Sequence, residues 1–154
     1  MSQTIEQKLA EIGITLPTPT APLANYVPVV RTGNLLFVSG QVSIDGAGKI
    51  MTGKLGADVD IETGRAAARL CAINILAQVK ASIGDLDKVV RVVKLVAFVN
   101  SLPDFTDQPK VVNGCSDLLV EVLGDKGRHA RSAVGIAALP FNAAVEVEAV
   151  VEVA

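Results

Sequence analysis

The chain has 154 residues, of which 50% are apolar and 19% are charged, and its formal net charge is −2. This length predicts one domain over residues 1–154. No Lys/Arg cluster alternates with aromatic residues, which weighs against a nucleic-acid partner, because phosphate neutralisation supplies most of such affinity. So few charges also predict that another subunit covers part of the surface.

The sequence predicts neither a membrane span nor an export signal. The uncharged stretch over residues 14–30 carries prolines that a spanning helix would not tolerate. The first eight residues lack the basic segment and the apolar segment of a secretory signal. We therefore expect a cytoplasmic protein without a membrane partner.

The N-terminal part predicts a short helix and then an extended connector. Residues 4–12 suit an amphipathic helix, in which Thr4 and Gln7 have capping-box spacing and Gly13 ends the helix. Residues 17–28 are rich in proline, which favours an irregular segment across the surface.

Two apolar runs, residues 27–31 and 35–38, flank residues 32–34 and predict a β-hairpin. Gly40 interrupts the second run and predicts a bulge or a close approach of another group to the backbone. The strand can then continue over residues 42–44.

A long helix is expected over residues 61–82, with Asp60 as its N-cap and Gly84 as its end. Its small apolar side chains would allow close docking on a sheet. The predicted buried stripe consists of Ala66, Leu70, Ile73, Ala77 and Ala81.

Valine-rich residues 88–100 predict a strand, followed by a second helix. Asp104 can cap this helix, which is predicted to run to Val122, unless it begins nearer Pro109.

The C-terminal part predicts two strands, the one that Arg131 enters and residues 145–153, joined as a hairpin by a turn containing Pro140. The order hairpin, helix, strand, helix, strand, strand favours an α+β sheet with both helices on one face.

The last strand has a clear alternation, because Glu146, Glu148 and Glu152 point one way and apolar side chains point the other. A solvated sheet face is the ordinary interpretation of such a pattern. A subunit interface or a cleft is the alternative.

Arg131 enters its strand with no acid near it in the sequence. An external carboxylate, held by the guanidinium fork, is the simplest counter-ion. Ala133, Gly135 and Ala137 share its strand face and would leave room for that anion. The alternative is an ion pair across the hairpin with Glu148 or Glu152.

Other reactive side chains are few. His129 is the only histidine and lies two residues before Arg131, so it could reach a site, although a loop or interface histidine is the commoner case. With no cluster of metal-type ligands we expect no metal and no cofactor. Cys71 and Cys115 suit buried thiols, and Ser39 and Ser132 suit hydrogen-bonding roles.

Several segments taken together resemble the RidA family, also called YjgF/L-PSP. They are Tyr26-Val27, the run Gly33 to Gln41, residues 79–86 and 89–99, Ala130-Arg131-Ser132, Leu139-Pro140 and Val145 to Ala149. Their order and spacing cover the chain from about residue 21 to residue 153. Residues 1–20 then form an N-terminal extension, as in a longer branch of the family.

The resemblance implies a chorismate-mutase-like α+β fold, assembled as a homotrimeric barrel with ligand clefts between subunits. It implies hydrolytic deamination of small 2-imino or enamine acids to 2-keto acids and ammonia, without a cofactor. By this likeness Arg131 holds the substrate carboxylate and Glu146 positions the hydrolytic water. The cleft residues implied are Tyr26, Ser39, Asn113 and the backbone at Ala133.

Two positions depart from the family pattern. Ala133 stands where relatives often have Cys, and Gly135 where many have Glu, so a larger cleft is expected. A non-catalytic trimer that binds a small carboxylate metabolite is therefore a second hypothesis. An endoribonuclease, which older family names imply, is the weakest, because the chain has an acidic pI near 5.4 and no basic stripe.

Overall fold

The computed structural model describes residues 3–19, 21–22 and 24–154. Thr20 and Leu23 of the predicted connector, and residues 1–2 of the extension, lie outside the described residues. The described part forms helices α1 (Ile5–Glu11), α2 (Ile61–Ile83) and α3 (Gln108–Leu123), and strands β1 (Val29–Thr32), β2 (Leu35–Val42), β3 (Val89–Asn100), β4 (Ala130–Ile136) and β5 (Val145–Val153).

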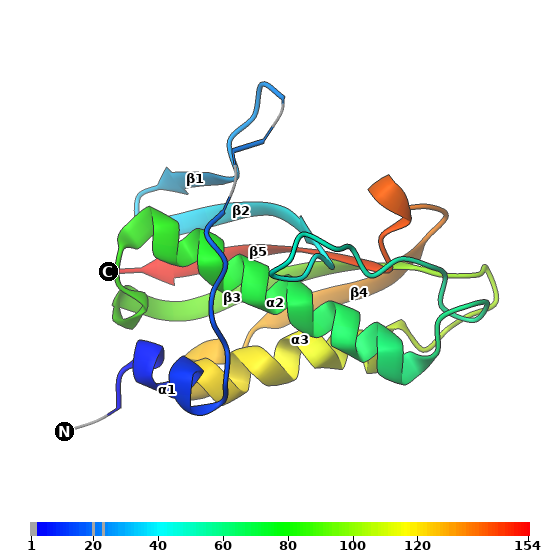
Figure 1. The fold of residues 1–154 in the computed structure, drawn as a ribbon. Coiled ribbons are helices and arrows are strands. Elements are labelled where there is room, and N and C mark those ends of the chain that lie inside the picture. Colours follow the sequence, from blue (N-terminus) through cyan, green and yellow to red (C-terminus); the bar gives the residue numbers. More distant parts are fainter. Residues whose placement is uncertain (1–2, 20, 23) are drawn as a thin grey trace.

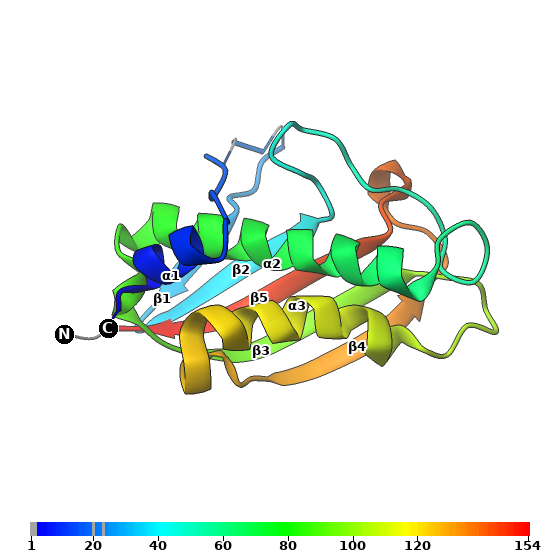
Figure 2. The ribbon, with the colours of Figure 1, turned by 60° about the horizontal axis from the view of Figure 1, so that its bottom comes forward.

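The strands form one mixed sheet in the order β1-β2-β5-β3-β4 (Figure 1). The β3–β4 pair is parallel and the other pairs are antiparallel. Helices α2 and α3 lie side by side across one face of the sheet (Figure 2). The predicted α+β class, with both helices on one face, is confirmed.

The predicted C-terminal hairpin is wrong. β4 pairs with β3, and β5 lies between β2 and β3, so β4 and β5 are not neighbours. Residues 137–144 therefore cross the end of β3, a distance of two strand spacings, or about 10 Å. Phe141 and Asn142, at φ of 60° and 56°, turn the chain in this connection.

The helix ends follow the predicted capping chemistry at two of three helices. Thr4 and Gln7 form the capping box of α1, and the Asp60 side chain accepts from the Thr63 backbone N–H at the start of α2. The Asp104 cap is wrong, because α3 begins at Gln108 with Pro109 in its first turn. This start agrees with the alternative near Pro109 and with the tolerance of the first turn for proline.

The predicted buried stripe of α2 is confirmed only in part, because Ala77 is buried and Ile73 packs against the core. Ala66 and Ala81 are exposed, and the buried side also includes residues outside the predicted stripe: Ala67, Cys71, Ile75 and Val79, spaced four apart. Because α2 has alanines on several of its sides, apolar spacing alone does not identify its buried side. α2 is long and apolar enough to cross a membrane, but 56% of its most apolar stretch is buried in the fold, as in a core helix.

Close packing of the two long helices depends on Gly114. A side chain at this position would collide with the backbone carbonyl of Arg65 on α2. α3 therefore lies against α2 backbone to backbone, and its Val111, Cys115 and Leu118 are completely buried. This packing fixes the position of α3 over the sheet.

The described part of the N-terminal extension belongs to the fold. Lys80 of α2 pairs with Glu6 of α1 at 3.0 Å, and the Ile5 backbone N–H donates to Asp87 at 2.9 Å. Leu9 is buried, and Ile12 and Ile14 pack against the core. α1 therefore closes one end of the helical layer.

No helix of the described residues covers the opposite face of the sheet (Figure 2). Paired residues of neighbouring strands point to one face, so this face can be read from the register. It carries Val30, Phe37, Val96, Phe98, Val134 and Val150 together with Lys94, Glu146, Glu148 and Glu152. Phe37 is 45% exposed and Val134 46% exposed, so the face is unusually apolar for one that meets water.

Candidate functional site

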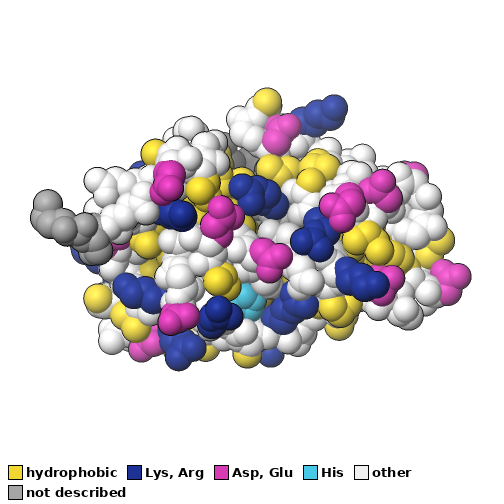
Figure 3. All heavy atoms as spheres, turned by 90° about the horizontal axis from the view of Figure 1, so that it is seen from below, with side chains coloured by type: hydrophobic (Ala, Val, Ile, Leu, Met, Phe, Trp, Pro, Cys, Tyr) yellow, Lys and Arg dark blue, Asp and Glu magenta, His cyan; other side chains and the backbone are white. Residues whose placement is uncertain are grey.

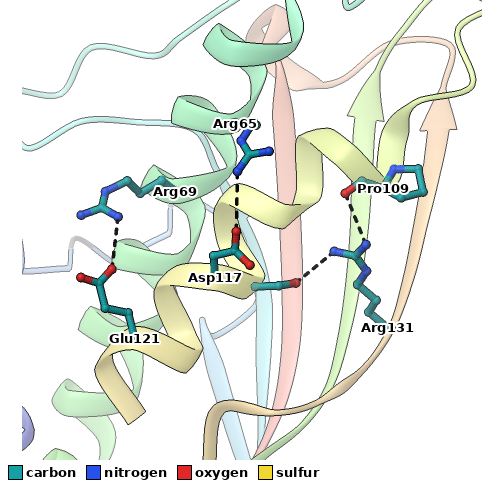
Figure 4. Close-up of polar contacts among 7 residues, drawn as sticks. Arg65, Arg69, Pro109, Asp117, Glu121 and Arg131 are labelled. Atoms are coloured by element: carbon teal, nitrogen blue, oxygen red, sulfur yellow. Dashed lines mark hydrogen bonds and ion pairs between the residues drawn. The ribbon is translucent and has the colours of Figure 1, made fainter. Parts of the chain in front are cut away.

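Arg131 lies under α3, held by two uncharged acceptors (Figure 4). Its Nη1 donates to the Ser116 hydroxyl at 3.1 Å and its Nη2 to the Pro109 carbonyl at 3.3 Å. Within residues 3–19, 21–22 and 24–154 no carboxylate lies within ion-pair distance of it. The predicted lack of an internal counter-ion is confirmed for this part of the chain, in which no acidic group neutralises the Arg131 charge.

By contrast, other arginines on the helical layer are neutralised inside the chain. Arg65 and Arg69 of α2 pair with Asp117 and Glu121 of α3, at 3.6 and 4.0 Å (Figure 4). These partners are surface groups, so each pair contributes little to stability. The comparison shows that α3 offers acids to the α2 arginines and only neutral oxygens to Arg131.

Asn113 and Ala133 lie on the same side as Arg131. Positions 109, 113 and 116 are spaced i, i+4 and i+7, which places them on one face of α3. Ala133 is two residues along β4 and packs against the core on the helical face. We call Arg131, Asn113, Ser116, His129 and Ala133 the Arg131 cluster.

The room expected at Gly135 is absent. A Cβ atom there would lie 2.7 Å from the side chains of both Gln108 and Ser101. The missing side chain therefore makes space for Gln108 at the start of α3 and does not enlarge a cleft.

Ser116 is a site residue that sequence reasoning missed. Its hydroxyl lies 2.9 Å from Nε2 of His129, whose Nδ1 lies 2.6 Å from the Gly127 carbonyl oxygen. Burial is the main cause that lowers the pKa of His129, and the nearby Arg131 charge lowers it further. The hydrogen bond to Gly127 raises it, but by less than burial lowers it. The one available sequence signal was the helical spacing of Ser116 from Pro109.

A second group of predicted residues surrounds Gly40. The Ser39 N–H donates to the Pro28 carbonyl at 2.8 Å, and its hydroxyl donates to the Val27 carbonyl at 3.2 Å. These bonds tie the segment after Tyr26 to β2. The predicted irregularity at Gly40 is confirmed as a register shift between Val38 and Gln41.

Glu146 lies directly against Gly40. Its carboxyl carbon is 2.8 Å from the position that a Cβ atom of residue 40 would occupy. Burial, followed by the charge of Glu148, raises the pKa of Glu146. A carboxylate with a raised pKa is a better proton acceptor for a water molecule.

Tyr26 is 57% exposed at the rim of a hollow of about 620 Å³. The hollow is also lined by Ser39, Gly40, Asn74 of α2 and Phe141. Phe141 is 77% exposed. We call Tyr26, Ser39, Gly40 and Glu146 the Glu146 cluster.

The two clusters lie on opposite faces of the sheet. Leu95 is fully buried under the helices and pairs with Arg131. Phe98, three residues further along β3, pairs with Glu146 and so points to the uncovered face. Within one chain, therefore, Arg131 and the acidic face of β5 do not meet, because they lie on opposite faces of the sheet.

The fold and the two clusters define a class: a mixed sheet covered by helices on one face, with an arginine that has no acidic partner on its edge strand β4 and a carboxyl group of raised pKa on the other face. The chain belongs to the YjgF/RidA family. Residues 6–153 match the family described as "YjgF/chorismate mutase-like, putative endoribonuclease".

Three relatives illustrate this membership. Protein TCP17 of Trypanosoma cruzi is 53% identical over 149 residues, 96% of this chain and 93% of that protein. A 2-iminobutanoate/2-iminopropanoate deaminase of Dermatophagoides farinae is 28% identical over 139 residues, 90% of this chain and 93% of that protein. The crystal structure of Atu1372 from Agrobacterium tumefaciens, described as of unknown function, has a TM-score of 0.92 at 55% identity and covers 98% of this chain and 94% of that one.

Proposed function

We propose that the protein hydrolyses small 2-imino acids to 2-keto acids and ammonia, with Arg131 as the carboxylate-binding residue. The observation that carries this proposal is the Arg131 guanidinium, which is held by neutral oxygens and is free to bind an anion. The deaminase named among the relatives supports the substrate class. The reaction needs no cofactor, because an imine carbon is already electrophilic.

The proposed chemistry assigns one step to each group. Arg131 orients the carboxylate of the substrate. Glu146 accepts a proton from a water molecule, whose oxygen bonds to the imine carbon. The nitrogen takes up protons, the carbon–nitrogen bond of the resulting carbinolamine breaks, and ammonia leaves as the keto group forms. Such acid–base assistance typically contributes a factor of roughly 10²–10⁴ in rate.

The proposed active unit is a homotrimer. Because Arg131 and Glu146 lie on opposite sheet faces of one chain, a common site requires Arg131 of one protomer and Glu146 of another. The uncovered sheet face favours a second copy as its occupant, since it exposes Val30, Phe37 and Val134. A hollow of about 250 Å³ on that face is bordered by both apolar and charged side chains.

The test is a coupled assay with purified protein. An amino-acid oxidase generates 2-iminopropanoate or 2-iminobutanoate, and ammonia release is followed with and without the protein. Acceleration at catalytic concentrations supports the proposal. Stabilisation of the protein by 2-keto acids in a thermal-shift assay, without acceleration, would instead favour a non-catalytic metabolite-binding protein.

RNA cleavage has weaker support. The face seen in Figure 3 carries Lys and Arg side chains interspersed with Asp and Glu, not a single basic stripe. Affinity for RNA depends on such a stripe.

Replacement of Gly40 by alanine is expected to reduce turnover of imino acids by about tenfold or more while the protein stays folded. The new methyl group would displace the Glu146 carboxyl, which can move because it ends a flexible side chain. Steady-state rates and circular dichroism check this result. Gly46→Ala is the matched control, because nothing lies within 4 Å of a Cβ atom there; equal rates in both variants would contradict the role of Gly40.

A further inference from the structure

Three groups behind Arg131 form a directed chain of hydrogen bonds. The Gly127 carbonyl oxygen can only accept, so Nδ1 of His129 carries the proton between them. The lone pair of Nε2 then accepts from the Ser116 hydroxyl, and the Ser116 oxygen accepts from Nη1 of Arg131. Each donor therefore points away from the guanidinium and toward Gly127.

Backbone packing fixes this series of hydrogen bonds in place. Gly127 lies so close to α3 that a side chain there would collide with the Leu119 carbonyl oxygen. The loop that holds His129 is thus anchored on the same helix that carries Ser116. Pro109, two turns earlier on α3, supplies the second acceptor to Arg131.

The acceptors orient Arg131 without cancelling its charge. A guanidinium has five N–H donors, and the hydroxyl and the carbonyl each take one. The donors that remain suffice for a two-point contact with a carboxylate. A glutamate in place of Ser116 would hold the arginine as firmly but would neutralise it.

We propose that Ser116 and His129 are positioning residues, which hold the Arg131 guanidinium in the orientation that binds a single compact carboxylate. This inference rests on the proposed function, because it takes Arg131 as the carboxylate site. It adds two residues to that site, and it assigns His129, the only histidine of the chain, a place behind the ligand and outside direct contact with it.

The Ser116–His129 pair also has the geometry of a nucleophile and its base. Positioning is favoured, because the Ser116 oxygen already accepts a hydrogen bond from Arg131 and Ser116 is partly buried. Covalent labelling of Ser116 by a fluorophosphonate probe would overturn the positioning role. No labelling is expected.

The decisive experiment measures binding and turnover separately. Binding of 2-oxobutanoate to the intact protein is followed by calorimetry in wild type, Ser116→Ala, His129→Gln, Ser116→Thr and Arg131→Ala. Ser116→Ala and His129→Gln are expected to raise Kd and KM by about tenfold, the size expected for one hydrogen bond to a charged group, and to change kcat by much less. Ser116→Thr keeps the hydroxyl and should retain binding.

The matched control is Ser132→Ala. Ser132 follows Arg131 in β4 but pairs with Val96 and faces the uncovered side of the sheet, so its removal leaves the chain of hydrogen bonds intact. A shift in Kd equal to that of Ser116→Ala would overturn the inference.

The pH dependence of Kd for 2-oxobutanoate distinguishes a positioning role from structural damage. Protonation of Nε2 reverses the His129–Ser116 bond and adds a positive charge behind the anion, so acidification through the lowered pKa of His129 should tighten binding in wild type. Burial raises the pKa of Cys115, the neighbouring thiol on α3, to about 12, outside the range of this profile. The profile is repeated with Glu146→Gln, because Glu146 is the acidic residue that the proposed site includes.

The tightening should persist in Glu146→Gln and disappear in His129→Gln. Unchanged Kd in Ser116→Ala and His129→Gln, together with loss of binding in Arg131→Ala, would overturn this inference alone. Unchanged binding in Arg131→Ala would overturn the proposed function, and a wild type that binds no keto acid would overturn both.

Discussion

Replacement of Arg131 by alanine is expected to lower kcat/KM for imino-acid hydrolysis by about 10²–10³-fold and to abolish binding of 2-keto acids. Loss of one partner of a hydrogen-bonded charge pair has effects of this size. The change removes the charge and both bonds to α3, which are made to neutral acceptors. Ammonia release and calorimetric titration measure the two effects.

Two further variants sharpen this result. Arg131→Lys keeps the charge but loses the planar fork, so an intermediate defect is expected. Arg69→Ala is the matched control, since it removes the same side chain from a surface ion pair. Full activity in Arg131→Ala, or an equal loss in Arg69→Ala, would contradict the carboxylate-binding role.

A mixture of two inactive variants is expected to regain activity. If each site takes Arg131 from one protomer and Glu146 from the next, trimers assembled from equal amounts of Arg131→Ala and Glu146→Gln subunits contain some intact sites. Random assembly leaves about a quarter of the sites with both residues. About a quarter of wild-type activity is therefore expected after co-expression of the two variants.

The separation of the two residues in one chain makes this test decisive. If both residues of a site came from one protomer, every site would lack one of them and the mixture would remain inactive. Each variant assembled alone serves as the baseline. Activity of the mixture no higher than the baseline would contradict a site shared between protomers.

The local elements could largely be predicted from the sequence. The side chains of Thr4 and Asp60 mark helix starts by hydrogen bonds within a few residues, and Gly84 marks the end of α2 with a φ of 79°. The alternation of apolar and polar residues in β5 predicted its buried face correctly, because a strand places successive side chains on opposite sides. Buried Cys71 and Cys115 agree with the interpretation as free thiols.

Non-local features could not be predicted in this way. The position of β5 between β2 and β3 depends on which strands pair with the valine-rich β3. No short-range pattern in β4 or β5 indicates this pairing. The same holds for Ser116, which reaches His129 and Arg131 only because Gly127 docks on α3. The cytoplasmic location stays a prediction from the sequence.

The most direct measurement is a crystal structure of the protein soaked with 2-oxobutanoate. We predict a carboxylate bound in two-point contact by Arg131 of one protomer, with Glu146 and Ser39 of a neighbouring protomer facing the keto carbon. A ligand bound elsewhere, or an Arg131 side chain engaged by glutamates of its own chain with no ligand beside it, would contradict the account.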